Sequence, residues 1–211
     1  MQSNYMEPNW AEENLQTIRT LMERSAIYRR ALAPIMLFVG FVGVLTAVVE
    51  LVFHFDSMFK FCWLWLGSAL FAVAGAFLIA RRQALNDKDA FWSSPTRRVA
   101  QALFPPLATG MCLGVVFSLA DVGNEFTMLI ALLWVLFYGC ALNAASFFMP
   151  RGMKLFGWIY IAGGCCQFLL LATGHANFVL AGPLLMGSFF GVLHLAYGAY
   201  LYLTEKGKNA A

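Results

Sequence analysis

The stretch Leu155–Thr204, LFGWIYIAGGCCQFLLLATGHANFVLAGPLLMGSFFGVLHLAYGAYLYLT, runs for fifty residues without an Asp, Glu, Lys or Arg. A helix crosses the hydrocarbon core of a bilayer with about 20 apolar residues, so this stretch is too long for one span. Near its middle, Thr173–Asn177 supplies residue types that are typical of a turn. We therefore expect two membrane helices here, over Leu155–Thr173 and Phe178–Leu203.

Four further apolar windows precede this stretch, and each holds a long run without charged residues. A membrane β-barrel would instead alternate polar and apolar residues, so the unbroken runs indicate helices. The expected spans are Leu32–Phe53, Phe61–Ala80, Ala102–Ala120 and Phe126–Phe148. The sequence therefore predicts an all-α polytopic membrane protein with six transmembrane helices in three consecutive hairpins.

The composition of the whole chain agrees with this fold class. Hydrophobic residues make up 61% of the 211 residues and charged residues 12%, against about 45–50% and 25% in soluble domains. So few charges cannot cover a soluble protein of this size, which excludes an ordinary globular enzyme and a disordered chain. The net charge of +3 is too small to indicate a nucleic-acid partner, so the lipid bilayer is the partner that the composition predicts.

The basic residues predict the orientation. Thirteen of the fourteen Lys and Arg side chains precede the first span, lie between spans two and three or four and five, or follow span six. Only Lys60 falls on the opposite side. Because cytoplasmic loops carry an excess of Lys and Arg, we expect both termini in the cytoplasm. The predicted parts are a cytoplasmic segment 1–31, a membrane domain 32–204 and a cytoplasmic tail 205–211.

The N-terminal segment contains the pattern of one amphipathic helix, over Asn9–Arg30. Leu15, Ile18 and Met22 recur at three- and four-residue spacing and form an apolar stripe. This helix could lie on the membrane surface, pack under the protein's own bundle, or bind a cytoplasmic protein through the stripe. Pro34 follows where this helix meets the first span, and it predicts a kink or a break.

Three polar residues fall inside the predicted spans, where they are costly: Asn143, Gln167 and His194. They form a candidate intramembrane polar site, although hydrogen bonds that hold helices together are the more common reason for such residues. Small residues surround His194, so we expect it to face protein. The small-residue faces Gly110–Gly114 and Gly187–Gly191 could pack within one chain or between two copies in a homo-oligomer.

Glu50, His54 and His175 form a second candidate site, an outer rim. Glu50 and His54 are four residues apart, so their side chains could meet on one helical face. No metal-ligand spacing supports a metal site there, and the five cysteines contain no Cys-x-x-Cys pair. The sequence therefore predicts neither a metal nor another cofactor, and it contains no convincing catalytic residues.

Two patterns resemble those of a set of uncharacterised bacterial six-helix inner-membrane proteins with an N-terminal amphipathic helix. They are ENLxxIRxxME over Glu13–Glu23 and HLxYG over His194–Gly198. The resemblance covers the ends of the chain and implies location in a bacterial inner membrane, near genes for winged-helix regulators. It implies no catalytic residue.

Two functions of different classes fit these features. The first is a non-enzymatic interaction or sensing role, in which the helix Asn9–Arg30 binds a cytoplasmic partner. The second is a small-solute or ion transporter or channel that uses Asn143, Gln167 and His194. A hydrated path to these residues would favour transport, and a dry, closely packed bundle would favour the first role.

Overall fold

The computed structural model describes residues 8–55, 57–86, 91–120, 123–149, 151–175 and 181–209. All regular structure within these ranges is helical. The α-helices are α1 (Pro8–Phe53), α2 (Met58–Asn86), α3 (Ser94–Leu119), α4 (Thr127–Ala145), α5 (Arg151–Ala172), α6 (Gly182–Met186) and α7 (His194–Asn209). Short 3₁₀ turns, η1 (Asn124–Phe126) and η2 (Ser146–Phe148), flank α4, and a π-helical segment, η4 (Gly187–Leu193), joins α6 to α7.

Six helices in the described residues are long and apolar enough to cross a membrane, which confirms the predicted number of spans. The first lies within the longer helix α1, over Leu32–Phe53, where the described side chains resume, and the others differ from the predicted bounds by a few residues. These spans are Met58–Asn86, Thr96–Leu119, Asn124–Phe148, Gly152–Ala172 and Gly182–Thr204. The start predicted for the last span, Phe178, lies outside the described residues.

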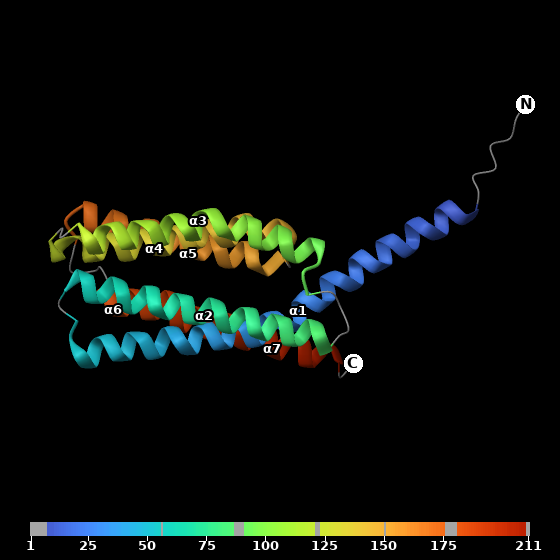
Figure 1. The fold of residues 1–211 in the computed structure, drawn as a ribbon, viewed down its shortest axis with the longest axis horizontal. Helices are drawn as coiled ribbons and strands as arrows, with labels where there is room; N and C mark the ends of the chain where they lie inside the picture. Colours follow the sequence, from blue (N-terminus) through green and yellow to red (C-terminus); the bar gives the residue numbers. More distant parts are fainter. Residues whose placement is uncertain are drawn as a thin grey trace, which may run out of the picture.

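The spans form two layers (Figure 1). One layer contains α3, α4 and α5, and the other contains α1, α2 and the final span built from α6, η4 and α7. Helix α4 packs against both α3 and α5, whereas α1 packs against α2, η4 and α7. Large apolar side chains such as Leu70, Phe71 and Leu169 are exposed on the outside of the bundle, as expected for a surface that faces lipid.

Helix α1 is a single helix that contains Pro34, so the break that Pro34 predicted is absent. Among its described side chains, Leu32 and Ala33 are buried, and the part of the helix before them leaves the bundle at an angle (Figure 1). A proline removes one backbone hydrogen bond of the helix. In a packed bundle, neighbouring groups satisfy the carbonyl that loses this bond, so the helix continues through Pro34. Leu15 is 65% exposed, whereas the side chains of Ile18 and Met22 lie outside the described set.

Small residues bring α1 and η4 into close contact. A Cβ atom at Gly191 would lie 2.9 Å from the backbone nitrogen of Val44, and one at Gly187 would lie 2.7 Å from the Cβ of Ala47. The face Gly187–Gly191 therefore packs within the chain. The face Gly110–Gly114 does the same, since Trp134 lies against it.

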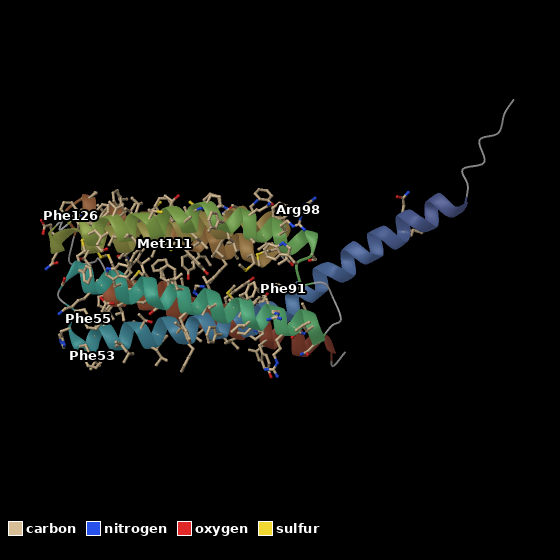
Figure 2. The ribbon with its side chains drawn as sticks, viewed as in Figure 1. Phe53, Phe55, Phe91, Arg98, Met111 and Phe126 are labelled. Carbon is tan, nitrogen blue, oxygen red and sulfur yellow. The ribbon has the colours of Figure 1, made fainter. Side chains whose placement is uncertain are left out.

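The two ends of the bundle are distinct. The first part of α1 and the end of α7 emerge at the same end (Figure 1). Figure 2 places Phe91 and Arg98 at that end and places Phe53, Phe55 and Phe126 at the opposite end. We call the latter the α1–α2 loop end of the bundle.

Candidate functional site

His194 is the most deeply enclosed polar side chain in the described part of the bundle, with no solvent-exposed surface. It is the first residue of α7 and directly follows the π-helical segment η4. It also lies near the middle of the span Gly182–Thr204. Single π-helical turns within α-helices are rare and often occur at functional sites, so this position is the leading candidate.

Two tyrosines bind the two ring nitrogens of His194. The Oη of Tyr138, from α4, lies 2.7 Å from Nε2, and the Oη of Tyr160, from α5, lies 2.9 Å from Nδ1. The Tyr160 hydroxyl also donates a hydrogen bond to the carbonyl oxygen of Phe189, within η4. This Tyr138–His194–Tyr160 network therefore joins α4 and α5 of one layer to η4 and α7 of the other.

The geometry selects one arrangement of protons. Tyr160 has a single hydroxyl proton, and the carbonyl of Phe189 can only accept, so this proton points to Phe189. The Tyr160 oxygen then accepts a hydrogen bond from Nδ1–H of His194, which leaves Nε2 to accept one from Tyr138. Because a neutral imidazole satisfies every contact, the network is complete without a charge.

Aromatic rings enclose the network. The rings of Phe156 and Phe190 lie 5.3 Å and 6.3 Å from the imidazole ring, centroid to centroid. Tyr197 stacks on Phe156 at 4.6 Å, and the backbone of Gly152 leaves room for its hydroxyl. These contacts make the interior around His194 closely packed and apolar.

The three predicted polar residues, Asn143, Gln167 and His194, lie at three different depths along the bundle axis. Asn143 follows Tyr138 on α4, and Gln167 follows Tyr160 on α5, by five and seven residues respectively. Because α4 and α5 run in opposite directions, these offsets place the two amides about 7 Å and 10 Å from the His194 level, toward opposite ends of the bundle. The side-chain nitrogen of Asn143 is buried without a hydrogen-bond partner among the described residues, and Gln167 is half-buried. The single polar site predicted from the sequence is therefore not assembled.

The predicted outer rim is not assembled either. Glu50 is only 4% exposed, and its Oε2 accepts a hydrogen bond of 2.7 Å from Nε1 of Trp65. His54 follows the end of α1 with a left-handed φ of 47°, so the four-residue helical spacing to Glu50 is lost. Its ring lies 3.1 Å from the carbonyl oxygen of Val52, whereas the exposed His175 contacts the Thr173 hydroxyl at 3.0 Å.

Sequence reasoning missed three partners of these polar groups: Tyr138, Tyr160 and Trp65. Each places a hydroxyl or an indole N–H inside an apolar span, and such a group usually has a hydrogen-bond partner when it is buried. That signal indicates that a partner exists. It does not identify the partner, because Tyr138 and His194 are far apart in the sequence.

No group of His, Cys, Asp and Glu side chains in the described ranges could hold a metal ion. Four of the five cysteines are exposed on the bundle surface, and Cys62 is buried. No protein-family model, curated protein or solved structure matches this chain.

Proposed function

We propose that this chain is a non-enzymatic membrane protein with an interaction or sensing role, exerted through its N-terminal helix. The supporting observation is that α1 continues without interruption from Pro8, outside the bundle, to Phe53 at the far end (Figure 1). The exposed Leu15 lies on the outer part, where the sequence predicts an apolar stripe with Ile18 and Met22. We propose that this stripe binds a cytoplasmic protein.

The packing of α1 supports a link between this outer part and the membrane interior. Gly40 of α1 approaches α7 so closely that a Cβ atom there would lie 2.7 Å from the backbone nitrogen of Leu195. Leu195 directly follows His194, whose hydrogen bonds reach α4 and α5. A change in the position of α1 would therefore act directly on the helix that carries the Tyr138–His194–Tyr160 network.

We propose a bacterial inner-membrane location with three helical hairpins and both termini in the cytoplasm. The uneven distribution of Lys and Arg supports this orientation. Arg98 lies at the end of the bundle from which α1 projects, which fits a cytoplasmic position for that end (Figure 2). The packing of α1 on α2 and of α3 on α4 fits the first two hairpins.

The interaction is tested by deleting Met1–Arg24 from a tagged chain and comparing the proteins captured from bacterial cells after cross-linking. We expect a specific cytoplasmic protein to be captured by the full chain and lost with the deletion, while the six spans still insert. A substitution of Leu15, Ile18 and Met22 by Asp should have the same effect as the deletion. If the full chain, the deletion variant and the triple Asp variant all captured the same cytoplasmic protein equally, this would contradict the proposal.

A second candidate function is the transport of a small solute or an ion. The side-chain nitrogen of Asn143, which has no hydrogen-bond partner among the described residues, favours it, because a polar group buried inside a membrane is a default functional suspect. Reconstituted protein would then show a flux that His194→Ala or Asn143→Leu reduces. His194 favours the interaction role over transport, because its two ring nitrogens are already hydrogen-bonded to Tyr138 and Tyr160.

A further inference from the structure

Glu50 is a carboxyl group enclosed in the membrane-spanning part of α1. It belongs to the span Leu32–Phe53 and is only 4% exposed. Its position three residues before the end of that span would allow a side chain to reach the aqueous interface. The side chain is instead turned into the bundle, toward the indole of Trp65 on α2.

No positively charged side chain among the described residues contacts the carboxyl group of Glu50. The one hydrogen bond that the structure gives it comes from Nε1–H of Trp65, a neutral donor, and no cation among the described residues pairs with it. Trp65 is itself buried and packs against Phe190 of η4, with ring centroids 6.4 Å apart. An ionised carboxylate in such surroundings would be strongly destabilised, because a single neutral donor replaces its water shell.

Among the described residues of the elements that pack around Glu50, no titratable group provides that charge. On α1 the next is His54, which is exposed and contacts Val52. On α2 they are Lys60, which is exposed, and Cys62, which is buried. The α6 and η4 segments carry no titratable side chain, and His194 beyond Phe190 is bound by its two tyrosines.

From this geometry we propose that Glu50 is an intramembrane proton-binding site that holds its proton at neutral pH. The carboxylate takes up one proton at Oε1 and forms the neutral acid, while Oε2 keeps the hydrogen bond from Trp65. A metal cation is a poorer ligand, since such ions need several oxygen atoms and this site supplies one carboxyl group. The proposal goes beyond the interaction role of the N-terminal helix and does not depend on it.

A short polar seam extends from Glu50 along the α1–α2 interface. One turn further into the bundle, the Thr46 hydroxyl lies 2.8 Å from the Ser68 hydroxyl, which donates to the carbonyl of Leu64. The Thr46 hydroxyl also lies 2.9 Å from the carbonyl oxygen of Val42, and the proton of the Ser68 hydroxyl goes to a backbone acceptor. The Thr46–Ser68 pair thus adds polar groups to the α1–α2 interface one turn from Glu50, and it supplies no cation to that carboxyl group.

The test is infrared difference spectroscopy of the full chain in lipid nanodiscs between acidic and alkaline pH. Solvated carboxyl groups are ionised at pH 7. We therefore expect a carboxylic-acid C=O band at pH 7 that Glu50→Gln abolishes and that Glu125→Gln, at an exposed carboxyl, leaves unchanged. Trp65→Phe removes the donor and should shift the band to higher wavenumber, which gives a readout that does not require a substitution of Glu50.

Three results would overturn the proposal. One is the absence of a carboxylic-acid band at pH 7 in the unmodified protein. Another is a band that persists unchanged in Glu50→Gln, since it would then belong to another carboxyl group. The third is a loss of the band when sodium replaces potassium at constant pH, because this would identify a metal cation as the ligand.

Discussion

The hydroxyl oxygen of Tyr138 lies 2.7 Å from Nε2 of His194, across the boundary between the two helix layers. Tyr160 binds the other ring nitrogen and also the carbonyl of Phe189, so three helical elements meet at one imidazole. Hydrogen bonds between membrane helices contribute about 0.6–2 kcal/mol each. The network is therefore a specific connection between the two layers.

Replacing Tyr160 by Phe should destabilise the bundle by about 1–2 kcal/mol, because it removes contacts with both His194 and Phe189 while keeping the ring. Tyr138→Phe removes one contact and should cost less. Unfolding in mixed micelles measures both effects. Tyr202→Phe is the matched control, since Tyr202 is 57% exposed on α7, and a loss of stability no greater than in this control would count against the network.

His194→Ala should have a larger effect, about 2–4 kcal/mol, because it leaves a cavity and removes a partner from both tyrosine hydroxyls. His194→Phe fills most of the volume and should recover part of this loss. If the network couples its members, combining His194→Phe with Tyr138→Phe should cost less than the sum of the two single changes. Additive losses would show that the two side chains stabilise the bundle independently.

Gly40→Ala should impair folding, since the added Cβ would lie 2.7 Å from the backbone of Leu195 and force α1 and α7 apart. Gly67→Ala is the matched control on α2, because nothing lies within 4 Å of its added Cβ. The control should be neutral or slightly stabilising, as alanine favours helix. The yield of folded protein and its thermal stability in detergent check this pair, and equal behaviour would contradict the close approach of α1 and α7.

The orientation is tested with single cysteines in a background that lacks the native ones. A cysteine at Lys60 should react with a membrane-impermeant maleimide in intact cells whose outer membrane is permeable to the reagent. One at Arg98 should react only after the inner membrane is opened. Both positions are exposed, so a reversed pattern would overturn the proposed orientation without ambiguity.

The number of spans was predictable because a membrane helix needs a long apolar run, and that requirement is local in sequence. The predicted end of the first span at Phe53 agrees with the end of α1 for the same reason. The continuity of α1 through Pro34 was not predictable, because bundle packing and not local preference decides whether a proline ends a helix.

The candidate site was predictable only in part. His194 was selected because a polar side chain inside a membrane is costly, but its partners depend on how α4, α5 and α7 face one another. The expected contact between Glu50 and His54 failed because α1 ends at Phe53, as predicted, and His54 after it takes a left-handed backbone conformation that breaks the helical spacing.

The central proposal, that the projecting part of α1 binds a cytoplasmic protein, is tested most directly by photo-cross-linking in living cells. A photoreactive residue replaces the exposed Leu15, and another replaces Phe71, an exposed side chain on the membrane-spanning part of α2, as a control. The account predicts a discrete adduct with a soluble protein from position 15, which Ile18→Asp with Met22→Asp abolishes, and none from position 71. Adducts from position 15 with lipid or with the chain's own bundle alone would contradict it.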